Sequence, residues 1–226
     1  MLTQKNASII GKFPIFSMLS EAEIERLEGM VEKHVVPKYS FLFLAGDVSD
    51  HIYFLVKGSL KISTHSSDGK EVIKSVLHPL AMFGEMAIIG ETHRPDFAQA
   101  MNNEVHYYSL KVEDFKKIMQ TNFELCSNVL TMMGSRLRKA ENRLEGLIFK
   151  DARTRIIDFI KEAASDRGRK VGFETLFKHT LTQQDIANIT GTSRQTVTSV
   201  LNELRKENLI YFNRNSILIR DLAKLV

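Results

Sequence analysis

The spacing of hydrophobic residues changes along the chain, and each change marks a different predicted structure. From Val35 to about Leu110, short apolar segments such as HIYFLVKG and EVHYYSL alternate with turn residues such as Gly46-Asp47. Several short strands separated by such turns are typical of a β-sandwich or a β-barrel. The central part of the chain is therefore predicted to be a β domain.

A short helix is predicted ahead of these strands, within residues 12–34. Ser20 followed by Glu23 is the signature of a capping box, in which each residue satisfies a backbone N–H group of the other. Ile24, Leu27 and Val31 continue the pattern at helical spacing. After the strands, residues 112–120 (VEDFKKIMQ) predict another short helix.

A long helix is predicted from about Phe123 to Leu147. Its apolar residues recur at spacings of 4, 3, 4, 3, 4 and 3, namely Cys126, Leu130, Met133, Leu137, Ala140, Leu144 and Leu147. These are the a and d positions of a heptad, a narrower stripe than a helix needs to pack on its own domain. The pattern predicts a parallel homodimer with this helix as its axis. A core helix within one chain is the alternative.

Residues 181–204, LTQQDIANITGTSRQTVTSVLNEL, predict two helices joined by a tight turn. Thr182 is expected to cap the first helix, with Asp185 in the place of the capping-box Glu. Gly191 permits the left-handed conformation of a sharp turn. Ser193 is expected to cap the second helix. Two helices joined in this way indicate a helix-turn-helix, for which a helical hairpin with a polar solvent face is the alternative.

The second of these helices has one apolar and one polar face. Val197, Val200, Leu201 and Leu204 form the apolar face, and Arg194, Gln195, Thr198, Ser199 and Asn202 form the polar one. Arg suits the acceptors of guanine, and Gln suits adenine. Hydroxyl groups near free N–H groups at a helix start favour phosphate. The predicted DNA-binding residues are Arg194, Gln195, Ser199, Thr198, Thr192, Ser193, Thr196, Thr182 and Gln184.

The flanking segments predict a winged helix. A linker is expected at 146–151, followed by an amphipathic helix with Ile156, Ile157, Phe159 and Ile160 buried. A loop is expected at 165–170, and VGFETLFKH then predicts a short hairpin. After the helix-turn-helix, LIYFNRNSILI alternates around an Asn-Arg-Asn turn and predicts a β-wing.

Composition narrows the classes of function. The formal net charge is +4, of which residues 150–226 carry +5 and residues 1–149 carry −1, so the C-terminal part favours a nucleic-acid partner. No apolar run is long enough for a membrane helix, and MLTQKNASII has no secretory pattern. The single cysteine, Cys126, fits a reducing cytoplasm. No nucleophile–base motif, metal-ligand cluster or Gly-rich phosphate loop indicates an enzyme.

Three segments, GTSRQTVTSVLNELRKENLI, AGDVSDHIYFLVKGSLKI and FGEMAIIG, resemble the cyclic-AMP receptor / fumarate-nitrate regulator family of bacterial transcription factors. The resemblance covers nearly the whole chain and implies an α+β fold. It predicts a β-roll of the cyclic-nucleotide-binding type (a double-stranded β-helix) at 1–120, a dimerisation helix at 121–148 and a winged helix-turn-helix at 149–226. A generic jelly roll or cupin is the alternative for the β part. Double-stranded DNA, a second copy of the chain and RNA polymerase are the implied partners.

The effector pocket implied by this resemblance comprises Gly84, Glu85, Met86, Arg94, Asp96 and Phe97. Gly84-Glu85 matches the family pattern, but Pro95-Asp96 stands where an Arg and a small hydroxyl residue grip the cyclic phosphate. Ala140 and Glu141 replace the Thr-Ser pair that meets adenine. We therefore expect no tight binding of cyclic AMP, and the effector is unidentified.

The fumarate-nitrate branch carries a similar His-x-Pro-x-Phe-Ala-Gln-Ala run and holds an iron–sulfur cluster with four cysteines. One cysteine excludes that cluster within this chain. The histidines have no ligand spacing, so no metal site is predicted. The sequence thus predicts a dimeric transcription regulator that binds a palindromic DNA site. An effector-binding module whose C-terminal domain docks a protein is the alternative.

Overall fold

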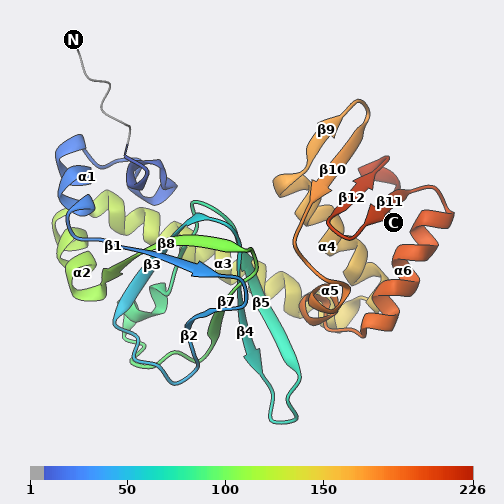
Figure 1. Ribbon diagram of the computed structural model, residues 1–226, viewed down its shortest axis with the longest axis horizontal. Helices are drawn as coiled ribbons and strands as arrows, with labels where there is room; N and C mark the ends of the chain where they lie inside the picture. The colour runs from blue at the N-terminus through green and yellow to red at the C-terminus, as the bar shows by residue number, and fades with distance from the viewer. Residues whose placement is uncertain (1–7, 226) are drawn as a thin grey trace. The chain divides into compact units, whose positions relative to one another are not determined.

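The structure, a computed structural model, describes residues 8–225 and confirms the predicted α+β architecture of β-roll, long helix and winged helix-turn-helix (Figure 1). The chain is divided into two compact units. One takes in the chain up to Thr64 together with Lys74–Leu137, and the other comprises His65–Ile73 and Arg138–Val226. The expectation that MLTQKNASII is no secretory leader falls mostly on residues 1–7, which lie outside the described residues.

Two four-stranded sheets make up the roll. One sheet has the order β1-β8-β3-β6 and the other β2-β7-β4-β5. The strands are β1 (Glu32–Pro37), β2 (Phe41–Phe43), β3 (His51–Lys57), β4 (Leu60–His65), β5 (Glu71–Leu77), β6 (Met82–Phe83), β7 (Phe97–Ala100) and β8 (Glu104–Lys111). A 3₁₀ turn, η3 (Glu85–Ile89), follows β6. The predicted many-stranded β domain is confirmed.

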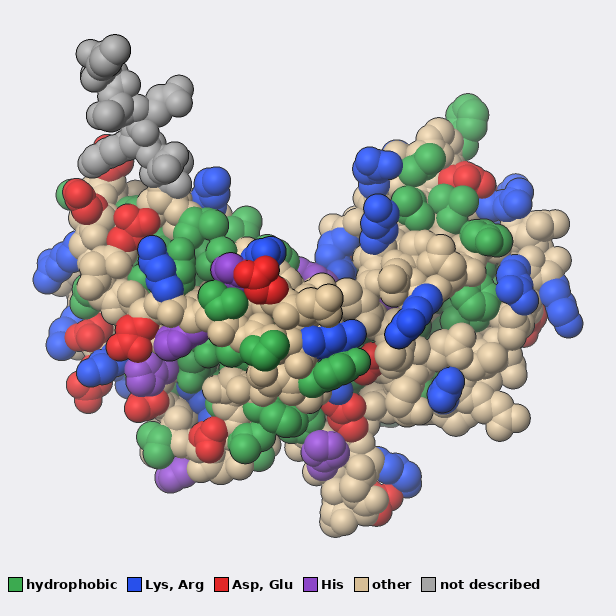
Figure 2. Space-filling model, in the orientation of Figure 1, with side chains coloured by type: hydrophobic (Ala, Val, Ile, Leu, Met, Phe, Trp, Pro, Cys, Tyr) green, Lys and Arg blue, Asp and Glu red, His purple; other side chains and the backbone are tan. Residues whose placement is uncertain are grey.

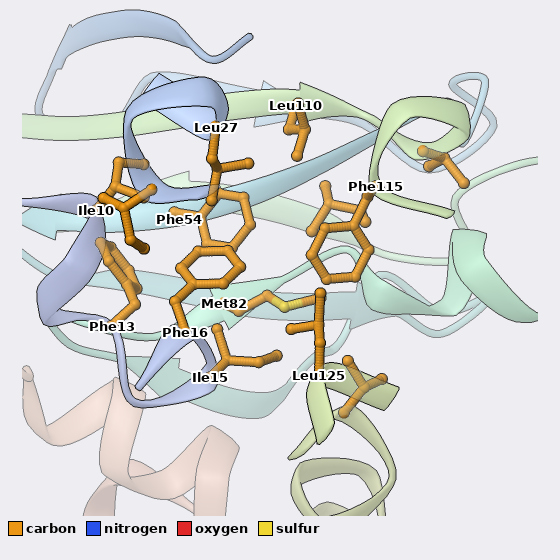
Figure 3. Packing of buried hydrophobic residues seen from close by; sticks show 14 of the residues in the cluster. Ile10, Phe13, Ile15, Phe16, Leu27, Phe54, Met82, Leu110, Phe115 and Leu125 are labelled. Atoms are coloured by element: carbon orange, nitrogen blue, oxygen red, sulfur yellow. The ribbon is translucent and has the colours of Figure 1, made fainter. Parts of the chain in front are cut away.

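Alternating residues of β3 place apolar side chains on both faces of its sheet. Leu55 packs between the two sheets with Leu60 and Phe83. On the opposite face, Phe54 packs against the aromatic residues of the covering helical segments, as Figure 3 shows for Phe13, Phe16 and Phe115. These segments are η1 (Ile10–Lys12), η2 (Pro14–Phe16), α1 (Glu21–Glu28), α2 (Val112–Thr121) and the start of α3 (Phe123–Phe149).

Helix α3 has two apolar faces. Leu125 and Val129 are buried in the roll core, and Met132 packs against that core. The predicted seam is offset by one residue from this inward row, and its members Leu130, Leu137 and Leu144 are 68%, 62% and 60% exposed. Cys126 and Met133 are partly buried, and Met133 also packs on the roll. The beginning of the seam therefore contacts its own domain.

The winged helix-turn-helix contains three helices and one sheet. The helices are α4 (Ala152–Arg167), α5 (Gln183–Thr190) and α6 (Arg194–Lys206). The sheet has the order β11-β12-β10-β9, from β9 (Arg169–Val171), β10 (Glu174–Lys178), β11 (Ile210–Asn213) and β12 (Ser216–Ile219), and a last 3₁₀ turn is η4 (Leu222–Lys224). Ile157, Ile160, Phe177, Leu201 and Leu204 are buried. The predicted hairpin and wing are confirmed.

Some local predictions were wrong because tertiary structure overrides local pattern. The capping box of Ser20 and Glu23 is present, but α1 ends at Glu28 and Val31 lies outside it, since the chain turns to enter β1. The expected linker at 146–151 is largely helical, because α3 runs to Phe149. The expected loop at 165–170 is reduced to Gly168, between α4 and β9. Phe159 is only partly buried.

Candidate DNA-binding surface and effector pocket

The turn between α5 and α6 is built as the sequence predicts. Thr182 and Asp185 form a complete capping box at the start of α5. Gly191 ends that helix in the left-handed conformation, with φ of 64°. Ser193 caps α6 by accepting a hydrogen bond from the N–H of Thr196 at 3.0 Å. These local bonds fix where the second helix begins, and so where Arg194 stands.

Arg155 on α4, which the sequence pattern did not indicate, braces this turn. Its guanidinium donates to the carbonyl oxygens of Thr190 at 2.9 Å and Gly191 at 3.1 Å. It also donates to the carbonyl of Lys150 at 2.7 Å. Helix C-terminal carbonyls lack partners within their own helix, so an arginine is a suitable donor there. Since the partners lie 35 and 36 residues along the chain, no local pattern reveals this role.

Helix α6 presents the predicted polar face to solvent. Val197, Val200, Leu201 and Leu204 are buried, as predicted, whereas Arg194, Gln195 and Ser199 are exposed. Exposed donors and acceptors on one side of a helix that is anchored by its other side match the requirement for reading base edges.

The remaining predicted DNA-binding residues are partly engaged within the protein. Thr198 donates from its hydroxyl to Gln183 or to the carbonyl of Arg194. Thr196 and Ser193 share a hydrogen bond between their hydroxyl groups at 2.8 Å, and Thr192 is partly buried. Gln184 donates to Asn188 at 2.8 Å, although its side chain is exposed. Among the predicted residues, Arg194, Gln195 and Ser199 are exposed, and their side chains have no hydrogen-bond partner within residues 8–225.

Basic residues outnumber acidic ones in this region of the chain. Residues 150–226 hold 14 Lys and Arg against 9 Asp and Glu. Figure 2 shows several Lys and Arg side chains, and few acidic ones, on the visible face of the winged helix-turn-helix. A positive surface attracts the phosphate backbone without regard to sequence, and base contacts add the specificity.

In the roll, Gly84 and Glu85 stand at the start of η3. Gly84 has φ of 77°, and a Cβ there would lie 3.0 Å from Nη1 of Arg94, so the position requires glycine. Met86 is 43% exposed and Phe97 is buried. The six predicted pocket residues thus lie on η3, on β7 and in the segment between them.

Arg94 is buried, with 3% of its surface exposed. Its guanidinium donates to the carbonyl of Gly84 at 3.2 Å and to that of His51. It also lies 4.8 Å from the ring centre of Phe43 and 5.5 Å from that of Tyr53, in cation–π geometry. Burial raises the pKa of Tyr53, and the charge of Arg94 acts against this shift. The Arg94 side chain is therefore held by its own chain.

The two carboxylates of the predicted pocket also have partners within the chain. Glu85 forms an ion pair with Arg136 of α3, which donates in addition to the carbonyl of Met82. Asp96 pairs with Lys74 of β5 at 2.6 Å. Arg136 was not among the predicted pocket residues, although it follows Leu125, Val129 and Met132 on the inward row of α3 at a spacing that is visible in the sequence.

Comparison with known protein families matches both parts of the chain. Residues 33–122 match the model of a cyclic nucleotide-binding domain, and residues 154–226 match that of a Crp-like helix-turn-helix domain. This chain belongs to the CRP/FNR family. It is a transcription regulator of that family, with a helix-turn-helix DNA-binding domain; the members it matches are regulators rather than enzymes.

Relatives in the CRP/FNR family align over almost the whole chain. A CRP-like cAMP-activated global transcriptional regulator of Mycobacterium tuberculosis is 28% identical, covering 96% of both chains. The cyclic AMP receptor protein of Thermus thermophilus is 25% identical, covering 94% of both. Among solved structures, a CooA mutant from Carboxydothermus hydrogenoformans has a TM-score of 0.77 at 25% identity, with 88% of both chains covered.

Several residues of this CRP/FNR member differ from the family pattern for the nucleotide that its relatives' names suggest. A cyclic phosphate needs free donors. Two nitrogens of the Arg94 guanidinium donate to backbone carbonyls, and only the buried Nε has no hydrogen-bond partner within residues 8–225. Asp96 stands in the place of a phosphate-binding residue, but its carboxylate pairs with Lys74 and offers no donor to an anion. Ala140 and Glu141 lie exposed on α3. Within residues 8–225 there is no cluster of three or more metal-ligating side chains, and no helix has the length and apolarity to cross a membrane.

Proposed function

We propose that this CRP/FNR member is a homodimer that binds a palindromic DNA site, with α6 of each copy in the major groove. The observation that carries the proposal is the two-sided character of α6. Its apolar residues are buried, whereas Arg194, Gln195 and Ser199 are exposed and free to contact bases. Arg194 reads guanine in this proposal, because guanidinium binds O6 and N7 of that base with two hydrogen bonds.

The outward row of α3 supports the homodimer. Leu130, Leu137 and Leu144 recur every seven residues and are largely exposed. Leu147 is exposed as well, and so are the neighbouring Ile148 and Phe149 at the end of the helix. A second copy of the same helix buries such a stripe in a coiled coil. With two-fold symmetry, the DNA half-sites lie about one helical turn, roughly 34 Å, apart.

Selection from a randomised duplex library tests this function directly. The full chain is expected to enrich a two-fold symmetric sequence, with half-sites spaced by one turn. Binding to the selected duplex, measured by mobility shift at two salt concentrations, is expected to weaken steeply as salt increases. Failure to enrich any sequence would support the alternative function, a C-terminal domain that docks a protein. RNA polymerase remains the partner proposed for the DNA-bound dimer.

We also propose that cyclic AMP is not the effector, unlike in the relatives named above. The proposal rests on the internal bonds of Arg94 and Glu85 and on the position of Asp96. Calorimetric titration of the full chain with cyclic AMP is expected to show no binding at micromolar concentrations. A dissociation constant in the micromolar range or below would contradict the proposal, while leaving DNA binding itself untouched.

A further inference from the structure

One hydrogen bond joins the two helices of the helix-turn-helix on the side that faces solvent. The hydroxyl of Thr198, in the second turn of α6, lies 2.7 Å from Oε1 of Gln183, the first residue of α5. Both side chains are partly buried. Thr198 was predicted to contact DNA directly and Gln183 was not, whereas in the structure the two side chains are bonded to each other.

The chemistry of the two groups determines what remains available to a ligand. A threonine hydroxyl has a single proton. In Thr198 that proton is donated to Oε1 of Gln183 or to the carbonyl oxygen of Arg194, which lies 2.9 Å away. The amide of Gln183 uses its oxygen as acceptor, which turns its nitrogen and two N–H donors away from Thr198. Within residues 8–225 that nitrogen has no hydrogen-bond partner.

We propose that Gln183 is a further DNA-contacting residue and that Thr198 is the positioning residue that holds it. This inference rests on the proposed DNA-binding function. The first helix of a helix-turn-helix crosses the DNA backbone, so the neutral N–H donors of Gln183 contact a phosphate oxygen rather than a base. Thr198 acts through Gln183: it keeps a flexible side chain in the binding orientation before DNA arrives.

A double-mutant cycle on the full chain tests the coupling, with the duplex selected by the wild type as probe. Gln183→Ala is expected to weaken binding about 2- to 12-fold, the range of one hydrogen bond. Thr198→Val, which removes the hydroxyl and keeps the shape, is expected to weaken it about 2- to 5-fold. In the Gln183→Ala background, Thr198→Val is expected to have no further effect. Additive effects would overturn the positioning role.

Two matched variants separate this role from a general loss of structure. Thr198→Ser retains the hydroxyl and is expected to bind as the wild type does. Gln183→Glu retains the acceptor for Thr198, and its charge suits a helix start, so the fold is kept. It loses the N–H donors and repels phosphate, and binding is expected to fall more than 10-fold. Wild-type affinity in Gln183→Glu would show that Gln183 makes no contact with DNA.

The assignment to phosphate is tested by repeating the library selection with Gln183→Ala. The selected sequence is expected to be unchanged, because a phosphate contact weakens all sequences alike. Relaxed preference at one base position would overturn the phosphate contact. If the wild type selects no sequence, or Arg194→Ala binds unchanged, the proposed DNA function fails. If both behave as expected and the cycle is additive, only the present inference fails.

Discussion

Two arginines, Arg94 in the roll and Arg194 at the start of α6, occupy opposite environments in this chain. The guanidinium of Arg94 is enclosed by carbonyl oxygens and aromatic rings. Arg194 is exposed on a helix whose other face is buried. The same side chain thus contributes to folding in one unit and, by our proposal, to recognition in the other. The comparison teaches that a charged residue in a predicted pocket is not by itself available to a ligand.

The largest effect is expected from a change that separates the two copies of the proposed dimer, because each α6 then contacts DNA alone. Leu137→Lys places a charge in the exposed row of α3, and we expect it to convert the dimer into a monomer. Loss of the second half-site is then expected to reduce DNA affinity more than about 100-fold, because the two sites no longer bind as one unit. Analytical ultracentrifugation and mobility shift measure the two effects.

Arg138→Gln, one residue along α3 and exposed, is the control for Leu137→Lys. It is expected to leave both the sedimentation coefficient and the affinity unchanged. A monomeric wild type, or a Leu137→Lys variant that remains dimeric, would contradict the proposed axis.

Arg94→Ala tests whether the buried arginine of the comparison contributes to folding. The substitution leaves the carbonyls of Gly84 and His51 without their donor and opens a cavity beside Phe43 and Tyr53. We expect the unfolding free energy of the roll to fall by about 2–4 kcal/mol. Thermal unfolding followed by circular dichroism measures this loss. The fraction that remains folded is expected to bind the selected duplex as the wild type does.

Arg194→Ala tests whether the exposed arginine contributes to DNA recognition. It is expected to cost about 1–3 kcal/mol of DNA-binding free energy and to relax the selection at one base position. The melting temperature is expected to stay within about 1 °C, because surface substitutions change stability little. Unchanged affinity for the selected duplex would show that the α6 face proposed here does not enter the groove.

A smaller effect is expected from His179, an inward-facing polar residue of the winged helix-turn-helix. Burial is the main cause that lowers its pKa; the nearby backbone of Leu181 acts in the opposite direction, and the neighbouring charge of Arg167 lowers the pKa further. As pH falls below about 6.5, His179 therefore binds a proton in the unfolded chain before it does so in the folded chain. The stability that neutral His179 contributes is present above this pH and is lost as pH falls toward its folded-state pKa.

Melting temperatures at pH 7.5 and pH 5 measure this dependence. The wild type is expected to lose a few degrees more than His179→Gln between the two pH values. Equal losses would show that His179 is not the group responsible. The ring of His179 lies tilted against that of Phe177, with 5.3 Å between centres. The difference in melting temperature between the wild type and His179→Gln at pH 7.5 therefore measures the packing that is lost, and serves as the control.

The sequence predicted features that depend on neighbouring residues. The capping boxes at Ser20 and Thr182 and the buried face of α6 were confirmed because cap and helix are determined within a few positions. Contacts between distant segments were missed, as for Arg136 with Glu85 and Arg155 with Gly191. The sequence does not show whether the partner of a polar side chain is solvent, a ligand or a distant carbonyl.

The brace formed by Arg155 has a consequence for the rigidity of the winged helix-turn-helix. One planar guanidinium holds the carbonyls of Lys150, Thr190 and Gly191, which come from the entrance of α4 and from the end of α5. A single side chain thus joins the start of α4 to the end of α5 through three hydrogen bonds. We therefore expect these two segments to keep their mutual orientation whenever this domain moves.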